Sequence, residues 1–496
     1  MEKPILIGEG SYGKVYRHSQ NLLYKELKLW IHDKTHSDNF IFIENNFKEL
    51  IFYNLILLFY KEHYSNFTIS FLLNVKFSHI LIPDKIEVEG SVAKIFFEHR
   101  GTILNDIKFI NFKQFFTIFK QLSQAIYELF DCNITHGDLK PTNILVDDKE
   151  NVTLIDFGSV CLFHNINITN SYQRCTLVYV SPEELIEQKY SIANDWWGIG
   201  VIMFEFLTEK SFIPSLMVFY KLSNKMVQNF IDDVFYNKKK DDFNSKMYLT
   251  NFLKKLKQKH IDYFINSYID SSTIKKVSPS FTNEQLVECK TLLTSLLTLD
   301  KIERINNKQK IIKYFNLELI ANECDNQSTN DLEHFKNLVI PHYSIELRKG
   351  FVDIIYYLCY STKIKKFSQE VFAHSIMLLD RFFVKLDINT LQESINYPVI
   401  CVLCVCLSSI VLKGEYFKSK EIVSIVEHLF EQKIEHTKIE ATLIFFLKQM
   451  NLSIFNLSPD LLINSSINYK KVNQILKEYI VVNENSLALY ELLTME

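Results

Sequence analysis

The sequence predicts an α+β fold, in which a β-rich part is followed by an α-rich part, and a separate all-α domain at the end. A glycine-rich turn between two strand-like segments, Ile7–Val15, lies near the start. A polar loop, His136–Val146, follows a long amphipathic helical pattern and leads into short strand patterns. The remainder, from about 340 to 496, contains almost no glycine and shows successive apolar helical patterns, which predict the separate domain.

The length and composition favour a multidomain globular protein. With 496 residues the chain exceeds a single compact core and fits two or three domains. A net charge of −3 gives no general attraction to nucleic acid or to an anionic membrane, so we expect no nucleic-acid partner. Because no apolar stretch long enough for a signal peptide precedes the first motif, we expect an intracellular protein, cytoplasmic or nuclear, that is not secreted.

Two apolar runs and a group of cysteines favour core packing. Leu50–Tyr60 and Val399–Leu412 are both shorter than the roughly 18 residues that a membrane span requires, so we expect buried helices and no membrane partner. Cys401, Cys404 and Cys406 lie in the second run with no histidine nearby, which favours packing over a zinc site. In an intracellular protein we expect free thiols.

The glycine-rich turn is a candidate site for nucleotide phosphates. Glycine lets the backbone approach phosphate oxygens, and apolar residues at both ends can cover an adenine ring. A structural hairpin or a dinucleotide loop that opens a helix would also fit the motif. Strand-forming residues follow the last glycine, which argues against the dinucleotide loop. The candidate nucleotide-binding residues are Ile7, Gly8, Glu9, Gly10, Ser11, Tyr12, Gly13, Lys14 and Val15.

A strand after the turn carries the candidate phosphate-binding lysine. Tyr16–His18 and Leu22–Leu27 predict a hairpin closed over Ser19–Asn21, with Lys25 in its second strand. The ammonium of Lys25 would reach the α- and β-phosphates. Lys28 is the competing candidate, because the hairpin is short.

A helix predicted over Asn45–Tyr60 carries the candidate partner of this lysine. Glu49, with apolar residues following it at helical spacing, is placed to pair with Lys25. Glu44 is the alternative, because the segment Ile31–Phe42 leaves the length of the intervening loop open.

The polar loop His136–Val146 and the later Ile155–Gly158 can form one Mg²⁺-phosphate site. Asn143 and Asp156 offer the hard oxygen ligands that Mg²⁺ prefers, and Asp138 can accept the proton of an attacking hydroxyl. The two segments predict phosphoryl transfer. They resemble the catalytic loop and the metal-binding Asp-Phe-Gly of the protein kinases, apart from a glycine where most members carry arginine.

Later motifs extend this resemblance over roughly residues 5 to 310. Ser181–Glu183, the helix opened by Asp195–Gly200 and the arginine Arg304, which is expected to pair with Glu183, are scaffold features of protein kinases. Small-molecule kinases of the aminoglycoside and choline type share the His-Gly-Asp loop but lack these features. Lys140 marks the Ser/Thr branch of the family.

The resemblance implies transfer of the γ-phosphoryl group of ATP to Ser or Thr hydroxyls of a protein substrate, with ATP and Mg²⁺ as cofactors. Val92–Glu98 resembles the strand before the hinge that binds adenine, where Glu98 and Arg100 would contribute. The implied catalytic residues are Lys25, which aligns the phosphates, Glu49, which holds Lys25, Asp138, which orients the hydroxyl, and Lys140, which steadies the γ-phosphate; Asn143 and Asp156 would bind Mg²⁺. A small-molecule kinase and a nucleotide-binding pseudokinase scaffold that recruits partners are the alternatives.

The segment before Ser181 resembles that of the cyclin-dependent kinases. It ends in Thr176–Tyr179, but Val180 stands where those kinases carry an arginine that shapes a pocket for proline. Their phosphorylated threonine corresponds to Ser171. The three positions of their phosphate-binding arginines hold Lys48, Gly137 and Cys161.

The C-terminal part resembles a cyclin box. Its predicted helices are Arg348–Tyr360, Gln369–Lys385, Pro398–Leu412, Ser419–Gln432 and Ile439–Asn451. The resemblance lies in short motifs in the cyclin order, among them Leu379–Phe382. Arg348 and Asp380 could form a buried ion pair between the first two helices. The lysine by which cyclins contact a kinase maps to Lys413, but Leu443 occupies the place of its glutamate partner and Glu440 is the nearest acidic residue.

The predicted organisation is a bilobal protein kinase fold followed by an all-α cyclin-like helical domain. The kinase domain spans 1–315, with an N-lobe over about 1–98 and a C-lobe over about 99–315. A linker spans 316–339, and the cyclin-like domain spans 340–496. The expected intramolecular partnership is that of the cyclin-like domain with the kinase domain.

Overall fold

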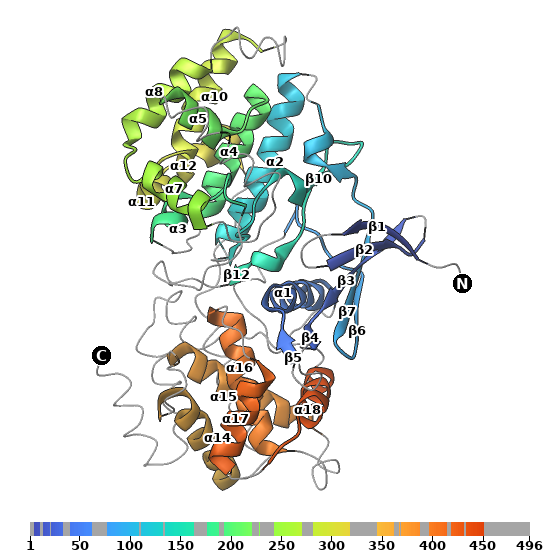
Figure 1. The fold of residues 1–496 in the computed structure, drawn as a ribbon. Coiled ribbons are helices and arrows are strands. Elements are labelled where there is room, and N and C mark those ends of the chain that lie inside the picture. Colours follow the sequence, from blue (N-terminus) through green and yellow to red (C-terminus); the bar gives the residue numbers. More distant parts are fainter. Residues whose placement is uncertain are drawn as a thin grey trace. The chain divides into compact units, whose positions relative to one another are not determined.

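A computed structural model of the chain divides it into two compact units. Unit 1 comprises Met1–Val75, Ile82–His99 and Ala321–Glu496, and unit 2 comprises Lys76–Leu81 and Arg100–Ile320. The N-terminal β-rich part and the C-terminal helices thus belong to one unit (Figure 1). The structure describes residues 4–9, 13–19, 21–32, 40–61, 77–108, 111–131, 134–162, 176–187, 193–220, 228, 243–269, 281–317, 345–361, 367, 369–386, 396–413, 418–430 and 433–450.

The main sheet of unit 1 has five antiparallel strands. In spatial order they are β1 (Ile5–Glu9), β2 (Gly13–Arg17), β3 (Leu22–Lys28), β7 (Val92–Glu98) and β6 (Lys85–Glu89). The central strand β3 pairs with β2 and β7, which places Lys25 between Val15 and Ile95. Because side chains alternate across a strand, Leu23 and Leu27 lie on one face of β3 and Tyr24 and Glu26 on the other. Both leucines are buried.

A second hairpin, β4 (Trp30–His32) with β5 (Phe40–Phe42), lies between β3 and helix α1 (Glu44–Lys61). Sequence analysis left most of this segment as a loop of open length. Three-residue strands are too short to produce a recognisable alternation, so their pairing is decided by the partners they find in space. Helix α1 begins one residue before the predicted start.

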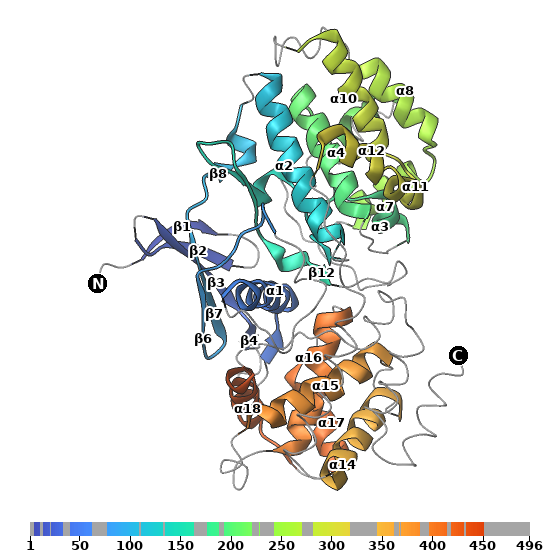
Figure 2. The same ribbon diagram turned by 180° about the vertical axis from the view of Figure 1, so that it is seen from behind.

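Helices form the rest of the described part of unit 1. They are α14 (Ile345–Tyr356), which continues as a π-helical turn (Tyr357–Ser361), α15 (Gln369–Lys385), α16 (Tyr397–Lys413), α17 (Ser419–Phe430) and α18 (His436–Gln449). Each overlaps a range predicted from sequence. The apolar helix α16 is buried against α15, and the two run side by side in both views (Figure 1, Figure 2). The predicted ion pair is confirmed, since Arg348 Nε and Nη2 lie 2.9 and 2.7 Å from the two carboxylate oxygens of Asp380.

The described cysteine side chains are buried and form no disulfide with one another, as predicted; they are those of Cys289, Cys359, Cys401, Cys404 and Cys406. Burial raises the pKa of the Cys359 thiol to about 12, so this thiol stays protonated at neutral pH. Cys401, Cys404 and Cys406 lie in the core at α16. No helix among the described residues is both long and apolar enough to cross a membrane.

Unit 2 is mainly helical, with two small sheets. Its helices are α2 (Phe112–Asp131), α3 (Pro182–Glu187), α4 (Ala193–Thr208), α5 (Phe212–Phe219), α7 (Phe243–Leu253), α8 (Gln258–Tyr268), α10 (Asn283–Leu296), α11 (Lys301–Asn306) and α12 (Lys308–Phe315). The first sheet has the order β11 (Val152–Leu154), β10 (Ile144–Val146), β8 (Thr102–Ile103), and the second pairs β12 (Cys161–Leu162) with β9 (Ile134–Thr135).

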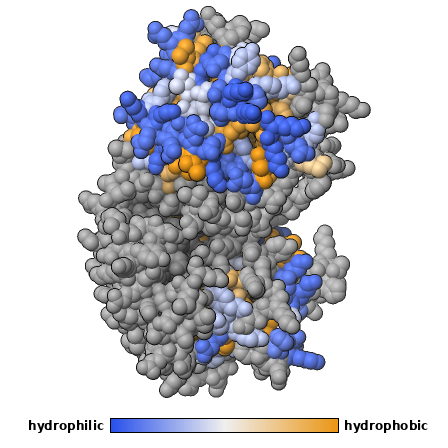
Figure 3. Space-filling model, turned by 90° about the vertical axis from the view of Figure 1, so that its left-hand side faces the viewer, coloured by the Kyte–Doolittle hydropathy of each residue, from blue (hydrophilic) through white to orange (hydrophobic). Residues whose placement is uncertain are grey.

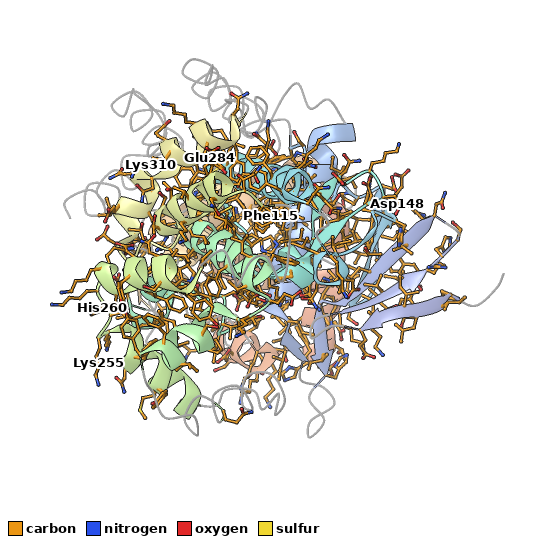
Figure 4. The ribbon with its side chains drawn as sticks, turned by 90° about the horizontal axis from the view of Figure 1, so that it is seen from above. Phe115, Asp148, Lys255, His260, Glu284 and Lys310 are labelled. Atoms are coloured by element: carbon orange, nitrogen blue, oxygen red, sulfur yellow. The ribbon has the colours of Figure 1, made fainter. Side chains whose placement is uncertain are left out.

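Apolar side chains fill the interior of unit 2 and charged ones cover it. Phe115 lies among the helices, whereas the labelled Lys255, Glu284, Lys310 and Asp148 lie at the outside (Figure 4). Figure 3 shows hydrophilic residues over most of the described face of this unit, with apolar residues scattered between them. Scattered apolar residues of this kind are usual on a protein surface.

A buried ion pair holds the end of unit 2 to its middle. Arg304 is fully buried, and its Nη2 contacts Glu183 Oε1 while its Nε donates to the carbonyl of Ala193 at 3.0 Å. The pair that sequence analysis predicted is therefore confirmed. An exposed pair nearby, Lys301 with Glu187 at 3.2 Å, joins the same two helices α11 and α3.

We predict that Glu183→Gln destabilises unit 2 by about 3–5 kcal/mol, because it leaves the guanidinium of Arg304 buried without its counter-charge. The matched variant Glu187→Gln should cost about 1 kcal/mol or less, since that pair is partly exposed to water. Native-state hydrogen exchange of the α4 amide groups measures both values. Equal losses in the two variants would contradict the prediction.

Candidate active site

In unit 1 the structure joins Lys25 to Glu49. Lys25 Nζ lies 2.6 and 2.8 Å from the two carboxylate oxygens of Glu49, whose side chain is 0% exposed while that of Lys25 is 15% exposed. The competing residues lie elsewhere. Lys28 is exposed at the end of β3, and Glu44 pairs with Lys48 at 2.8 Å. A strand residue and a helix residue thus hold one ammonium group in a fixed place.

The glycine-rich turn connects β1 to β2, and its tip, Gly10–Tyr12, lies outside the described residues. The register between the strands shifts between Leu6 and Gly8, which marks a bulge. A Cβ atom on Gly13 would lie 2.8 Å from the carbonyl oxygen of Glu26 in β3. Glycine therefore allows this end of the turn to lie directly against the strand that carries Lys25.

The candidate hinge residues lie at the division between the units. Glu98 ends β7, and the backbone N–H of His99 donates to the carbonyl of Asn21 at 3.0 Å. Within unit 2, Gly101 has φ +103°, and a Cβ there would lie 2.1 Å from the carbonyl oxygen of Val146. This backbone path requires glycine. Arg100 is exposed.

In unit 2, a carboxylate of helix α4 fixes the loop that begins at His136. Asp195, in the first turn of α4, accepts hydrogen bonds from the backbone N–H groups of His136 at 2.7 Å and of Gly137 at 3.1 Å. Burial raises the pKa of the Asp195 carboxyl, while the charge of His136 and these N–H groups act in the opposite direction. The imidazole Nε2 of His136 lies 2.9 Å from the carbonyl oxygen of Ile155, which ties the loop to the Asp-Phe-Gly segment.

Two glycines allow this loop to pack closely. Gly137 has φ +80°, and a Cβ there would lie 2.4 Å from the carbonyl oxygen of Ser159. A Cβ on Gly198 of α4 would lie 3.2 Å from Cβ of Leu139, so α4 lies directly under the loop. Gly137, which stands where most protein kinases carry arginine, therefore has a backbone conformation that disfavours larger residues.

The side chains of the loop form one hydrogen-bonded group around Asp138. Lys140 Nζ donates to Asp138 Oδ2 at 2.5 Å, and Asn143 Nδ2 donates to the Asp138 carbonyl at 2.8 Å. The hydroxyl of Thr176 lies 3.3 Å from both Lys140 Nζ and Asp138 Oδ1. The carboxylate is thus held by a cation on one side and a hydroxyl on the other.

The two candidate Mg²⁺ ligands come from neighbouring segments. The backbone N–H of Ile155 donates to the carbonyl of Asn143 at 2.9 Å, and Asp156 follows with a left-handed backbone at φ 66°. Because Asn143 uses its amide nitrogen toward Asp138, its amide oxygen is the atom that can face a metal. Among the described residues no cluster of three or more His, Cys, Asp or Glu side chains could hold a metal ion. One carboxylate and one amide fit Mg²⁺ that also binds phosphate oxygens and water.

The segment around Thr176 is fixed by a second buried group. The backbone N–H of Tyr179 donates to the carbonyl of Thr176 at 2.9 Å. The phenol hydroxyl of Tyr179 donates to Glu205 Oε2 at 2.7 Å. Ser211 donates to the other oxygen of Glu205 at 2.7 Å. Burial raises the pKa of Glu205, although these two hydrogen bonds lower it. Val180 is buried beside Tyr179, and Ser171 lies outside the described residues.

Sequence analysis gave no role to Thr176 or to the carboxylate of Asp195. Asp195 offered one signal, since a carboxylate in the first turn of an otherwise apolar helix has to find hydrogen-bond donors. Thr176 is separated from Asp138 by 38 positions and offered no comparable signal.

Comparison with known proteins supports the same chemistry. A family model described as "Protein kinase domain" matches residues 69–315, so it covers the loop around Asp138 but neither the glycine-rich turn nor Lys25. The chain is 28% identical over 227 residues to Serine/threonine-protein kinase AtPK1/AtPK6 of Arabidopsis thaliana, which covers 45% of this chain and 44% of that protein.

Two further relatives share shorter stretches. Serine/threonine-protein kinase 1 of Heliothis zea nuclear polyhedrosis virus is 31% identical over 150 residues, or 30% of this chain and 52% of that protein. Serine/threonine-protein kinase prpf4B of Dictyostelium discoideum is 30% identical over 170 residues, or 33% of this chain and 19% of that protein. The chain thus spans about half or less of the length of each of these relatives. With the geometry around Asp138, these matches identify residues 69–315 as a protein kinase domain of the eukaryotic Ser/Thr type.

Proposed function

We propose that this chain transfers the γ-phosphoryl group of ATP to Ser or Thr hydroxyls of protein substrates. The observation that carries the proposal is the group formed by Lys140, Asn143 and Thr176, each within hydrogen-bond distance of Asp138. A carboxylate next to an ammonium group can orient a hydroxyl and accept its proton while the ammonium steadies negative charge on the transferred group. An intracellular location, where ATP and protein substrates meet, is part of this proposal.

The remaining residues would hold the nucleotide. Lys25, fixed by Glu49, would align the phosphates, and Ile7 and Val15 would cover the adenine. Glu98 and Arg100 remain the proposed hinge contributors. Bound Mg²⁺, held by Asn143 and Asp156, would neutralise charge on the phosphates. The protein's own contribution is positioning, because phosphoryl transfer needs little covalent help from side chains.

Two other functions are distinguished by the products. A small-molecule kinase would phosphorylate amino alcohols, and a pseudokinase scaffold would bind ATP without transferring phosphate. The buried pair Arg304–Glu183 and the position of α4 under the catalytic loop favour a protein kinase over the first alternative. The intact group around Asp138 argues against the second. Radiolabelled ATP offered with peptides, with amino alcohols and with neither separates all three.

We predict that Asp138→Asn and Asp156→Asn each lower the rate of peptide phosphorylation by at least about 10²-fold. The first change removes the carboxylate that orients the hydroxyl, and the second removes a charged Mg²⁺ ligand. Asp148→Asn is the matched control, because Asp148 is exposed at the outside of unit 2 (Figure 4) and should leave the rate unchanged. Activity of Asp156→Asn within a few-fold of the unmodified chain would refute the site.

We also predict weak preference for proline after the phosphorylated residue. Cyclin-dependent kinases, which this segment resembles, carry an arginine at the position of Val180, and here that side chain is apolar and buried. A positional peptide library measures the preference. Ser-Pro peptides that outrun all others by about tenfold or more would contradict it.

We further propose that the C-terminal helices activate the kinase domain in cis, as their resemblance to a cyclin box suggests. Three contacts within unit 1 support a role at α1. The backbone N–H of Phe40 donates to Ser419 Oγ at 2.8 Å, Trp30 Nε1 donates to Glu440 Oε1 at 2.6 Å, and α16 contacts the Glu49 helix. Glu440 therefore contacts Trp30, and the side chain of Lys413 lies outside the described residues.

A phosphate on Ser171 would lack the three arginines that bind it in the cyclin-dependent kinases, because their positions hold Lys48, Gly137 and Cys161. Lys48 already pairs with Glu44, and Gly137 carries no charge. Guanidinium groups provide most of the bidentate contacts that order such a segment, so a single engaged lysine is a weak substitute. A tethered helical part is instead present at high effective concentration.

We predict that Ser171→Ala keeps most of the activity, whereas deletion of residues after about 326 loses most of it. Adding the separate segment 340–496 in excess should restore part of the lost rate. Peptide phosphorylation by the three proteins measures this. If the truncated chain were as active as the full one, the helical part would be a docking module and not an activator.

A further inference from the structure

We infer that the hairpin β4–β5 is the docking surface through which helices α17 and α18 keep Lys25 and Glu49 together, with Glu440 and Ser419 as positioning residues. The inference rests on the proposed kinase function and assigns its regulation to particular contacts. The hairpin lies in the chain between the strand that carries Lys25 and the helix that carries Glu49.

The two ends of the hairpin lead directly into these two elements. β4 begins two residues after β3 ends, and α1 begins two residues after β5 ends. The backbone N–H of Ile43 donates to the carbonyl of Leu29 at 2.8 Å, and the amide of Asn46 in α1 donates to the carbonyl of Lys28 at 2.7 Å. A displacement of the hairpin therefore pulls on both ends of the Lys25–Glu49 pair.

Aromatic packing connects the hairpin to α1. The rings of Trp30 and Phe47 stack with centroids 6.5 Å apart, and those of Phe42 and Phe47 meet edge to face at 5.5 Å. Phe47 is fully buried and lies two residues before Glu49 in α1. Because closely packed rings move together, the position of Trp30 affects the position of Glu49.

Two polar contacts attach this packed group to the C-terminal helices. The buried indole N–H of Trp30 donates to Glu440 of α18 at 2.6 Å, and His32 Nε2 lies 3.5 Å from the same carboxylate oxygen. The backbone N–H of Phe40 donates to Ser419 of α17 at 2.8 Å, and the imidazole of His436 lies 3.0 Å from that hydroxyl. A single antiparallel bridge between Ile41 and Lys418 adds backbone pairing.

Loss of the hydrogen bond between Glu440 and Trp30 would leave the buried indole N–H without a partner. An unsatisfied buried N–H group is costly, so the hairpin would rearrange to expose it to water. The rearrangement would loosen the stacking on Phe47 and open the Lys25–Glu49 pair. The carboxylate of Glu440 thus acts on catalysis through Trp30, without touching any phosphate.

The test compares Glu440→Ala, Glu440→Gln and the control Glu435→Ala in the full chain. Glu435 is exposed at the start of the same helix. In Glu440→Ala we expect kcat for peptide phosphorylation to fall about tenfold with the KM for peptide unchanged. Glu440→Gln should stay within about twofold, since an amide oxygen still accepts the indole hydrogen bond.

A second readout follows the pair itself. An amine-reactive ester should acylate Lys25 faster in Glu440→Ala than in the unmodified chain, as measured by mass spectrometry with the exposed Lys28 as reference. Amide hydrogen exchange in α1 should also become faster, whereas exchange in α15 and α16 stays slow. Lys25 acylation and α1 exchange that match the Glu435→Ala control would overturn the inference. This readout decides the inference even if the unmodified chain phosphorylates no protein, a result that would refute only the proposed function.

A double-variant cycle separates coupling from general damage. Trp30→Phe keeps a smaller aromatic ring and removes the N–H donor, so adding Glu440→Ala to it leaves no buried N–H group unsatisfied. The combination of the two should be no worse than either alone. Additive losses, or faster exchange in α15 and α16 of Trp30→Phe, would show that Glu440 serves only the fold of the helices and would also overturn the inference.

Discussion

The loop around Asp138 depends on one buried carboxylate. Asp195 accepts two backbone hydrogen bonds from the residues just before Asp138, and the loop has no long secondary structure of its own to hold it in place. Asp195 lies on α4, a helix that is buried along most of its length, so the rigidity of the core is transferred to the side chains of this loop. Gly198 lets the helix approach closely enough for this. Catalysis by positioning requires such a support beneath the side chains.

In unit 1, Lys25 and Glu49 are held in place by contacts between a strand, a helix and a hairpin. The pair Lys25–Glu49 joins a strand to a helix, and the amide of Asn46 in α1 adds a hydrogen bond to the carbonyl of Lys28 in β3. The aromatic side chains of the β4–β5 hairpin pack against Phe47 of α1, and the C-terminal helices contact this hairpin. A segment more than 300 residues away in sequence belongs to the same compact unit as Lys25.

The parts of the fold that the sequence predicted are those with long helical patterns or with motifs that resemble known families. Helices α15 and α16 were predicted to within one residue at each end because their apolar patterns are long. The ion pairs of Arg304 with Glu183 and of Arg348 with Asp380 were expected from the two family resemblances, and the structure shows both. Each gives a buried guanidinium group the counter-charge that it requires. The hairpin β4–β5 was missed because three-residue strands carry no usable period.

The sequence by itself determined which chemical groups are present: a carboxylate, a lysine and an asparagine at fixed spacing on one loop, and a strand lysine with two possible acidic partners. Only the tertiary structure decided which groups meet. It paired Lys25 with Glu49 and left Glu44 to Lys48, it brought Thr176 to Asp138, and it placed Glu440 against Trp30. Spacing along a chain fixes contacts within one loop or helix, whereas contacts between distant segments depend on how whole elements pack.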